Sequence, residues 1–468
     1  MNKLYYGDNL TILKSLYKQK EPFIDLIYID PPFNSKRNYN ILFEDLIKTK
    51  ENGKKTTALK EAFSDTWSNV SLSHELEEMK SLDNLTIYNF LTGNRNIFSD
   101  SQMSYLTMMA HRIYYMHKLL KDTGSFYLHC DPTMSHYLKI LMDIIFGKKN
   151  FKNEIAWCYR QGGRSSKMFS RKHDNIFFYS KTDKWIFNAD PIRIKYHGTG
   201  GYVSKGRNIV GGKTYKINPK GKIPEDWWDI PSLNPEAKER LGYPTQKPEA
   251  LLDRIIKASS NEGDLVADFF CGCGTTITVA EKLKRTWIGV DINHLAISLI
   301  EDKRLNPLKS KFQVVGFPTD QAQAEKLAKE KPFEFEQWVV EYVFKGHCTR
   351  KTRDGGFDGH ITFGVEKEKK LCLLEVKGGN CTVKNIREFD NVIQHQKADM
   401  GLFLCFKKQI TSGMKKHCDQ QGFIEIKNDI FMTQDANQIP RISIITIEDI
   451  LNKKLPSWIG QFLLNITY

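Results

Sequence analysis

The sequence predicts an α/β protein, with a doubly wound parallel sheet in residues 1–315 and a second, smaller α/β domain after it. Three observations support this fold class. Apolar strand-like runs alternate with helical segments, an order typical of parallel sheets. Asp-Pro-Pro-Phe follows one of these runs and a glycine loop follows another, as expected at the sheet edge where ligands bind. A length of 468 residues also suits two or three domains.

The expected elements follow from the spacing of apolar residues and from turn residues. Strands are expected at residues 4–9, 24–29, 125–129, 265–270 and 286–291. Helices are expected at 106–120 and 137–146. Three further helices are expected to end at residues 17, 259 and 283. Residues 46–85 are polar and rich in lysine, so we expect a long insertion over the site there.

The composition, with 26% charged and 40% hydrophobic residues, is that of an ordinary globular protein. No stretch resembles a secretory or membrane segment, so no membrane partner and a cytoplasmic location are expected. The nine cysteines are scattered, which fits reduced thiols. Cys271 and Cys273 lie inside a glycine loop and lack the paired spacing of a zinc site.

The charge distribution favours a polyanionic partner, because the net charge is +14. Between Arg160 and Ile223 there are 15 Lys and Arg against 3 Asp, interleaved with aromatic residues and glycines. Basic groups that neutralise phosphates, together with aromatic rings and flexible loops, suit a surface that contacts DNA. A merely solvated basic surface is the alternative, but it explains the concentration of charge less well.

The apolar run at 24–29 ends in Asp30-Pro31-Pro32-Phe33, which places an acid, two rigid prolines and an aromatic ring at a strand end. This set suits methylation of an exocyclic amino group on a nucleobase. The Asp30 carboxylate and the Pro31 carbonyl could accept the amino hydrogens, and Phe33 could stack on the flipped base. In isolation, the same residues could simply end a strand in a turn.

A second strand leads into the loop Cys271-Gly272-Cys273-Gly274-Thr275-Thr276, then a helix and a strand that ends in Asp291. An acid about 20 residues after such glycines is the layout of a nucleoside-binding unit. Alone, this loop could hold NAD or be a turn. The third glycine of the dinucleotide fingerprint is absent, which favours S-adenosylmethionine over NAD.

Taken together, these motifs resemble the β-class of amino-directed DNA methyltransferases, which have a Rossmann-like, S-adenosylmethionine-dependent fold. In that class Asp-Pro-Pro-Phe precedes a target-recognition region, here about residues 157–242, and the cofactor loop comes last. Further matching segments are Gly7-Asp8, 63–67, 124–131, 173–179 and Thr245 to Pro248. The resemblance covers nearly all of residues 1–315.

The resemblance implies roles for individual residues. Asp30, Pro31, Pro32 and Phe33 would be catalytic. The expected cofactor-binding residues are Asp8, Asp268, Phe270, Gly272, Gly274, Thr275 and Asp291, with Lys247 toward the cofactor carboxylate. Members that begin with Asp are mostly adenine-directed, so adenine is favoured and cytosine stays open.

The remaining chain is expected to hold a helical connector at 316–332 and a second domain at 333–468. Asp358 lies at a strand start, and Glu375 and Lys377 share one face of the next strand. Two carboxylates could bind Mg²⁺, and a lysine could assist an attacking water in phosphodiester hydrolysis. A strand end with exposed paired charges is the ordinary alternative.

This second domain resembles the PD-(D/E)xK nuclease superfamily, especially its Mrr-type restriction nucleases. The resemblance implies that Asp358, Glu375 and Lys377 are catalytic, with Asp358 and Glu375 as ligands of Mg²⁺. Glu341 and Gln396 are possible supporting residues. Such domains can also lose cleavage and persist as modules that bind DNA.

The sequence therefore predicts an enzyme of restriction–modification: an adenine-directed methyltransferase of double-stranded DNA with a fused Mg²⁺-dependent endonuclease. The main alternative is a methyltransferase, of adenine or cytosine, with an inactive nuclease-like tail that holds DNA. In a further alternative, the tail carries the main activity and residues 1–315 read the DNA sequence with little turnover. An RNA substrate is another alternative. A homodimer and a separate restriction or specificity subunit are left open.

Overall fold

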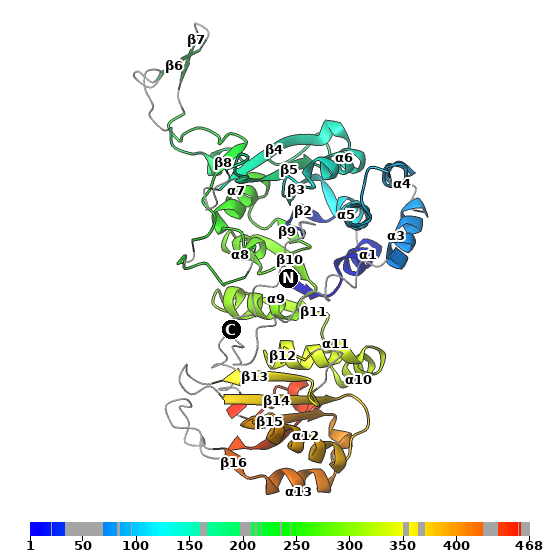
Figure 1. Ribbon diagram of the computed structural model, residues 1–468. Helices are drawn as coiled ribbons and strands as arrows, with labels where there is room; N and C mark the ends of the chain where they lie inside the picture. The colour runs from blue at the N-terminus through cyan, green and yellow to red at the C-terminus, as the bar shows by residue number, and fades with distance from the viewer. Residues whose placement is uncertain are drawn as a thin grey trace. The chain divides into compact units, whose positions relative to one another are not determined.

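The computed structural model describes residues 1–19, 21–32, 69–81, 85–94, 96–159, 166–196, 207–210, 213–216, 218–234, 236–243, 245–349, 355–363, 370–424, 439–456 and 458–459. Their contacts divide the chain into two units (Figure 1). The first unit contains residues 1–292 and 299–315, and the second contains residues 293–298 and 316–468. Every described helix is too short or too polar to span a lipid bilayer.

The first unit is built on a sheet with the described strand order β11-β1-β10-β9-β2-β3-β5-β4-β8. The strands from β11 to β3 are mutually parallel, whereas β5 runs antiparallel to β3 and β4. The bounds are β1 Asn2–Tyr6, β2 Ile24–Ile29, β3 Leu120–Cys130, β4 Phe151–Cys158, β5 His173–Ser180, β8 Trp227–Asp229, β9 Leu265–Asp268, β10 Thr286–Asp291 and β11 Phe312–Val315. A separate hairpin pairs β6, Arg207–Val210, with β7, Lys213–Lys216.

Helices connect these strands. They are α1 Asn9–Gln19, α3 Asn69–Ser81, α4 Leu85–Gly93, α5 Asp100–Leu119, α6 Ser135–Phe146, α7 Glu249–Ser259, α8 Thr275–Lys282 and α9 His294–Leu299. Single turns of 3₁₀-helix lie at Lys148–Asn150 and Asp190–Ile192, and a π-helix spans Ile300–Leu305. The alternation of parallel strands with helices is the doubly wound, Rossmann-like α/β arrangement that the sequence predicts.

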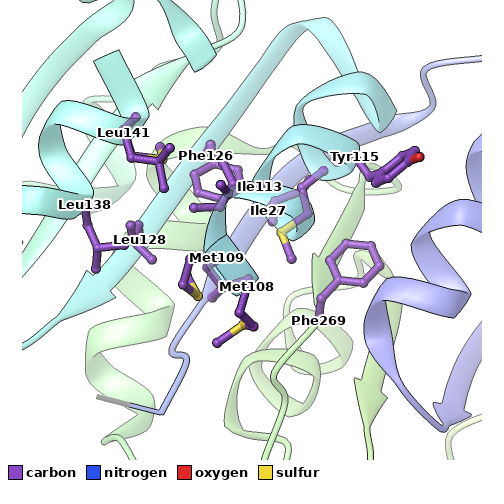
Figure 2. Packing of buried hydrophobic residues seen from close by; sticks show 14 of the residues in the cluster. Ile27, Met108, Met109, Ile113, Tyr115, Phe126, Leu128, Leu138, Leu141 and Phe269 are labelled. Atoms are coloured by element: carbon purple, nitrogen blue, oxygen red, sulfur yellow. The ribbon is translucent and has the colours of Figure 1, made fainter. Parts of the chain in front are cut away.

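The main core of the first unit lies between the sheet and a group of helices that includes α5. All six residues of β2 are buried, because a strand paired on both sides by parallel neighbours has two covered faces. Figure 2 shows Met108, Met109 and Ile113 of α5 close to Ile27 and Phe126 of the sheet. Flexible methionines fill the irregular space between a helix and a twisted sheet. This packing fixes the position of β2, and therefore the position of the residues that follow it.

Two helices differ from the sequence expectation. The helix expected at 106–120 begins at Asp100, because the Ser99 side chain accepts a hydrogen bond from the Gln102 amide in a capping box. Residues 69–81, expected as part of an insertion, form α3, and its Leu76 and Met79 are buried in the core. The rest of that expected insertion, together with Phe33, lies outside the described residues.

The second unit has a sheet of order β12-β13-β14-β15-β18, in which the last three strands are parallel. The strands are β12 His347–Cys348, β13 Gly359–Phe363, β14 Lys370–Lys377, β15 Met400–Cys405 and β18 Ile442–Thr446, with a small pair β16 Phe423–Ile424 and β17 Ile439–Pro440. The helices are α10 Gln321–Glu330, α11 Pro332–Gln337, the π-helix Trp338–Val343, α12 Val383–His395, the 3₁₀ turn Lys407–Gln409, α13 Ser412–Gln420 and α14 Ile447–Leu451. Ala324 and Ala328 of α10 are buried in this core, so the expected connector contains a packed helix.

Candidate active site and a second carboxylate centre

The two sequence motifs of the first unit meet at one sheet edge. Strands β2 and β9 are parallel neighbours, with Leu26 beside Val266 and Ile27 beside Ala267. Asp30 directly follows β2, and the glycine loop directly follows β9. The carboxyl ends of neighbouring parallel strands open onto the same crevice. The fold therefore places the Asp30 carboxylate and the glycine loop side by side.

Asp30 is held by Lys247, which comes from the segment before α7. Lys247 Nζ donates to Asp30 Oδ2, and the two side chains are only 9% and 17% exposed. Lys247 also donates to the Thr245 carbonyl at 3.4 Å. Pro31 is buried and Pro32 is half-buried, so the turn after Asp30 is packed in place. The sequence resemblance directs Lys247 to the cofactor carboxylate, whereas here its partner is Asp30.

Asp268, the last residue of β9, has both carboxylate oxygens engaged within the loop. Oδ1 accepts from the Phe270 amide at 2.9 Å, and Oδ2 accepts from Thr276 Oγ1 at 2.6 Å. Burial, together with the charges of Asp30 and Asp291, raises the pKa of Asp268 to about 7 against these hydrogen bonds. Asp268 therefore shapes the loop from inside.

The two glycines of the loop have different tasks. Gly272, at φ +50°, donates its amide to Asp291 Oδ2 at 2.8 Å, and a Cβ there would touch the Tyr243 ring at 3.4 Å. Gly274, at φ +75°, has no room for a side chain because a Cβ would lie 2.7 Å from Ile300 Cγ1. Gly272 with Asp291 therefore offers bare backbone beside a carboxylate, which fits a ligand that bears ribose hydroxyls. Gly274 serves packing.

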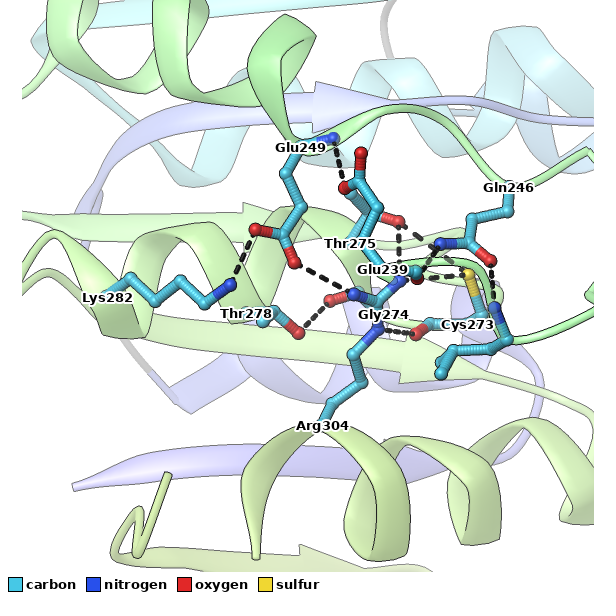
Figure 3. Close-up of polar contacts among 10 residues, drawn as sticks. Glu239, Gln246, Glu249, Cys273, Gly274, Thr275, Thr278, Lys282 and Arg304 are labelled. Atoms are coloured by element: carbon cyan, nitrogen blue, oxygen red, sulfur yellow. Dashed lines mark hydrogen bonds and ion pairs between the residues drawn. The ribbon is translucent and has the colours of Figure 1, made fainter. Parts of the chain in front are cut away.

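A buried arginine supports the loop from below. Figure 3 shows Arg304 between Glu249 and the loop. Its guanidinium pairs with Glu249 Oε1 at 3.0 Å and donates to the Cys273 carbonyl at 3.3 Å and to Thr275 Oγ1 at 3.4 Å. Thr275 is therefore turned inward, and the partly buried Phe270 packs against the core. Both residues, expected to bind the cofactor, stabilise the loop in this structure.

Asp8 caps α1 and pairs with an arginine from α5. Asp8 Oδ2 accepts from the amide and the hydroxyl of Thr11, both at 2.9 Å, while Oδ1 accepts from Arg112 at 2.9 Å. Burial would raise the pKa of Asp8, but Arg112 and Thr11 outweigh it and hold the pKa below its usual value. Asp8 is therefore an ionised carboxylate whose position is fixed at the sheet edge.

A hydrogen-bonded chain of buried side chains lies behind Asp30. Tyr28, two residues before Asp30 on β2, bonds His129 Nδ1 at 2.8 Å, and His129 Nε2 lies 3.2 Å from Asp174 Oδ2. Burial and the charges of Asp30, Asp268 and Asp174 raise the pKa of Tyr28, so it is a neutral phenol. This chain ties β2, β3 and β5 together at the edge where Asp30 lies.

The second unit brings Asp358, Glu375 and Lys377 together. Glu375 and Lys377 form an ion pair on β14, and Asp358 Oδ2 accepts from the Val376 amide at 2.7 Å. Burial and the nearby Asp358 charge raise the pKa of Glu375 to about 7, although Lys377 opposes this. Within the described ranges, no cluster of three His, Cys, Asp or Glu side chains is arranged to hold a metal. Two carboxylates alone could take Mg²⁺ only with water or phosphate as further ligands.

The supporting positions differ from one another. Burial raises the pKa of Glu341 to about 7, and its described partner is Cys348. Gln396 caps the carboxyl end of α12. Its Nε2 lies 3.5 Å from the position that a Cβ would take on Gly355. No contact of either residue with Glu375 or Lys377 is recorded among the described residues, so their role as supporting residues stays a prediction.

Sequence reasoning missed Arg112 and Arg304, and it gave His129 no role. Arg112 and Arg304 are 104 and 55 residues away from Asp8 and Glu249, respectively. An arginine inside a helical pattern reads as a solvated side chain, and nothing local signals its burial. The only available signal was the resemblance itself, whose matching segments contain His129 and Asp174.

Two known families match separate parts of the chain. Residues 332–433 match a family described as NACHT-associated inactive Restriction Endonuclease 1. The nuclease-like domain is therefore found where the sequence predicts it, but an active Mrr-type nuclease is not confirmed. The matching family is described as inactive, although Asp358, Glu375 and Lys377 are all present in this chain.

For the first unit, curated relatives are similar over much of their length. The type II methyltransferase M.HpaI of Haemophilus parainfluenzae is 30% identical over 295 residues, which are 62% of this chain and 71% of the relative. M1.MboII of Moraxella bovis is 36% identical over 38% of this chain and 70% of its own length. The DNA adenine methyltransferase YhdJ of Escherichia coli K12 is 34% identical, over 38% of this chain and 59% of its own.

The family match of the first unit spans more than half of the chain. Residues 24–302 match the DNA methylase family of N6/N4 methyltransferases. This range begins with β2 and includes Asp30, Lys247 and the glycine loop, so the match covers the sheet edge described above except for Asp8. The chain therefore belongs to the DNA methylase family.

Proposed function

We propose that residues 1–315 transfer a methyl group from S-adenosylmethionine to the exocyclic amino group of adenine in double-stranded DNA, as part of restriction–modification. One observation carries this proposal: Asp30 and the glycine loop follow neighbouring strands and open onto one edge of the sheet. One motif is suited to grip an amino group and the other to hold a nucleoside, so donor and acceptor would meet there.

The residues present fit the cofactor. Asp291 is a carboxylate suited to ribose hydroxyls, and Gly272 leaves its backbone bare beside it. When bound, S-adenosylmethionine supplies a methyl group activated by a positively charged sulfur. Asp30 and the Pro31 carbonyl would accept the amino hydrogens of the base, and Phe33 would stack on it after extrusion from the helix.

Two arguments favour adenine over cytosine. Motifs of this class that begin with Asp, as Asp30 does here, are mostly adenine-directed, and one relative, YhdJ, is named as an adenine methyltransferase. Cytosine N4 is the second candidate, because the matching family contains both specificities. The test is methyl transfer to unmethylated duplex DNA followed by mass spectrometry of the nucleosides. N6-methyladenine supports the proposal, whereas N4-methylcytosine or no product contradicts it.

DNA would be held by the basic region within the expected target-recognition segment. Strands β4 and β5 are antiparallel, and β5 begins at the edge where Asp174 contacts the His129 chain. β5 therefore begins at the sheet edge where Asp30 lies. The described residues just before β5 include Phe169, which is 99% exposed and two positions in the chain from both Lys167 and Arg171. An exposed ring between cations suits a surface that meets bases and phosphates.

For the second unit, we propose a nuclease-like module that holds DNA without cutting it, in line with the inactive family that it matches. Mg²⁺-dependent cleavage is a second candidate, favoured by the close approach of Asp358, Glu375 and Lys377. Incubation of the full chain with unmethylated plasmid and Mg²⁺ separates them. An intact plasmid supports the holding module. Strand breaks that vanish with Lys377→Ala would instead establish cleavage.

A further inference from the structure

We propose that Lys247 is a positioning residue for methyl transfer: it fixes the Asp30 carboxylate with one oxygen directed to the target amino group. This inference rests on the proposed amino methylation and adds to it a role for Lys247. The sequence resemblance directs this lysine to the cofactor, so the contact with Asp30 gives it a different task.

The geometry of the pair assigns the two carboxylate oxygens. Lys247 binds Asp30 Oδ2, and among the described residues none bonds Oδ1. Lys247 is itself held by the Thr245 carbonyl, in a backbone whose φ at Thr245 is +65°. Both side chains are mostly shielded from water, so their ion pair is screened less than a surface pair. Oδ1 is then the oxygen available to a substrate N–H.

Lys247 lies among several acids of this site, and its charge acts on more than one of them. Lys247 lies close enough to Asp174 that its charge helps to lower the Asp174 pKa, against burial and alongside hydrogen bonds from His129. The titratable groups whose pKa is raised in part by the charge of Asp30 are Tyr28, Cys130, Tyr243 and Asp268.

The reaction defines what Asp30 must do. The amino nitrogen forms a bond to the methyl carbon, the bond from that carbon to sulfur breaks, and its electron pair stays on sulfur. The positive charge thereby moves to nitrogen, which then releases one proton. The Asp30 carboxylate stabilises this charge through Oδ1, accepts the proton and passes it to solvent. Because Lys247 holds the other oxygen, Oδ2, it keeps Oδ1 directed to the amino nitrogen.

The experiment uses the full chain with the variants Lys247→Met and Lys247→Arg. The control is Lys257→Met, which removes a lysine from the surface. Lys257 pairs with Asp253 on α7, and both side chains are about one third or more exposed. We expect Lys247→Met to lower kcat by roughly 10- to 100-fold and to leave the KM for S-adenosylmethionine nearly unchanged. Lys247→Arg should restore part of kcat, and Lys257→Met should leave kcat and KM unchanged.

Binding of S-adenosylmethionine, measured by calorimetry without DNA, separates this role from the alternative. We expect the Kd of Lys247→Met to stay within about twofold of the wild type, which also shows that the variant folds. A Kd weakened about tenfold or more would overturn the proposal and return Lys247 to the cofactor carboxylate. If the wild type transfers no methyl group, the proposed function fails instead, whatever Lys247 binds.

Discussion

Each unit of the protein places a carboxylate–lysine pair at the end of a parallel strand, but the two pairs arise differently. Asp30 and Lys247 are 217 residues apart in the chain, and the fold alone brings them together. Glu375 and Lys377 are two positions apart on β14, so any strand with this sequence presents them together. Convergence of distant residues is therefore stronger evidence of a working site than a short motif that one strand supplies.

The neighbours of the two pairs differ as well. Beside Asp30 lies a glycine loop that is supported from below by Arg304 and from inside by Asp268. Beside Glu375 lies Asp358, whose charge raises the Glu375 pKa. The first arrangement prepares space and contacts for a ligand. The second brings two carboxylates together. A bound cation, or a proton on Glu375, would relieve their repulsion.

The largest effect is expected from blocking the cofactor loop. Gly272→Asp introduces a side chain at φ +50°, beside the Tyr243 ring and facing the Asp291 carboxylate. We expect binding of S-adenosylmethionine to weaken by more than about 100-fold and methyl transfer to vanish. The matched control is Gly379→Asp in the second unit, where a Cβ meets nothing within 4 Å. Equal losses in both variants would contradict the assigned cofactor site.

Removal of the loop support should destabilise the first unit. Arg304→Met leaves Glu249 without its buried partner and the Cys273 carbonyl without its donor. We expect a loss of about 2 to 4 kcal/mol of stability, seen as faster amide exchange in α8. Lys408→Met in the second unit removes a surface pair with Glu325 and should change stability by less than about 1 kcal/mol. Unchanged exchange in Arg304→Met would show that the loop stands without this support.

The Glu375 pKa gives a pH-dependent prediction. Its value in the folded protein, about 7, lies above the usual 4.5, so the folded state binds this proton more tightly than the unfolded state. The second unit therefore loses stability as the pH rises from 4.5 to about 7, by at most about 3 kcal/mol. Glu375→Gln should slow amide exchange in β14 at pH 8 and leave it unchanged at pH 4.

Magnesium sharpens the same measurement. If the second unit binds Mg²⁺, addition of the ion at pH 8 should slow exchange in β14 of the wild type and not of Glu375→Gln. If the unit is the DNA-holding module that we propose, Mg²⁺ should have no effect on either. Faster exchange in Glu375→Gln at pH 8 would show that the Lys377 ion pair outweighs burial and the Asp358 charge.

The smallest effect is expected on DNA binding. Phe169→Ala removes an exposed ring from the residues just before β5, and we expect the KM for DNA to rise by roughly 3- to 10-fold. Ile140→Ala on α6, outside the expected target-recognition segment, removes an apolar side chain that is 48% exposed and should leave that KM unchanged. An equal rise in both variants, or no rise with Phe169→Ala, would contradict a DNA contact through Phe169.

The strand motifs could be predicted from the sequence because their signals are local. The apolar run at 24–29 forms β2 with the expected ends, and the glycine loop follows a strand as expected, although that strand ends at Asp268, two residues early. The partner of Lys247 could not be predicted, since it depends on the path of the segment before α7 over the sheet edge. Arg304 shows the same limit: its helix gives no sign that it turns inward. Conversely, Asp358, Glu375 and Lys377 lie together as the sequence predicts, yet their catalytic role stays a prediction.

The most direct test is transfer of labelled methyl groups from S-adenosylmethionine to unmethylated duplex DNA by the wild type and by Asp30→Ala, without Mg²⁺. We predict that the wild type labels an exocyclic amino group. Asp30→Ala should lose at least about a thousandfold in rate while it still binds S-adenosylmethionine. Transfer that survives in Asp30→Ala, or label on a ring carbon, would contradict the claim that this sheet edge methylates an amino group.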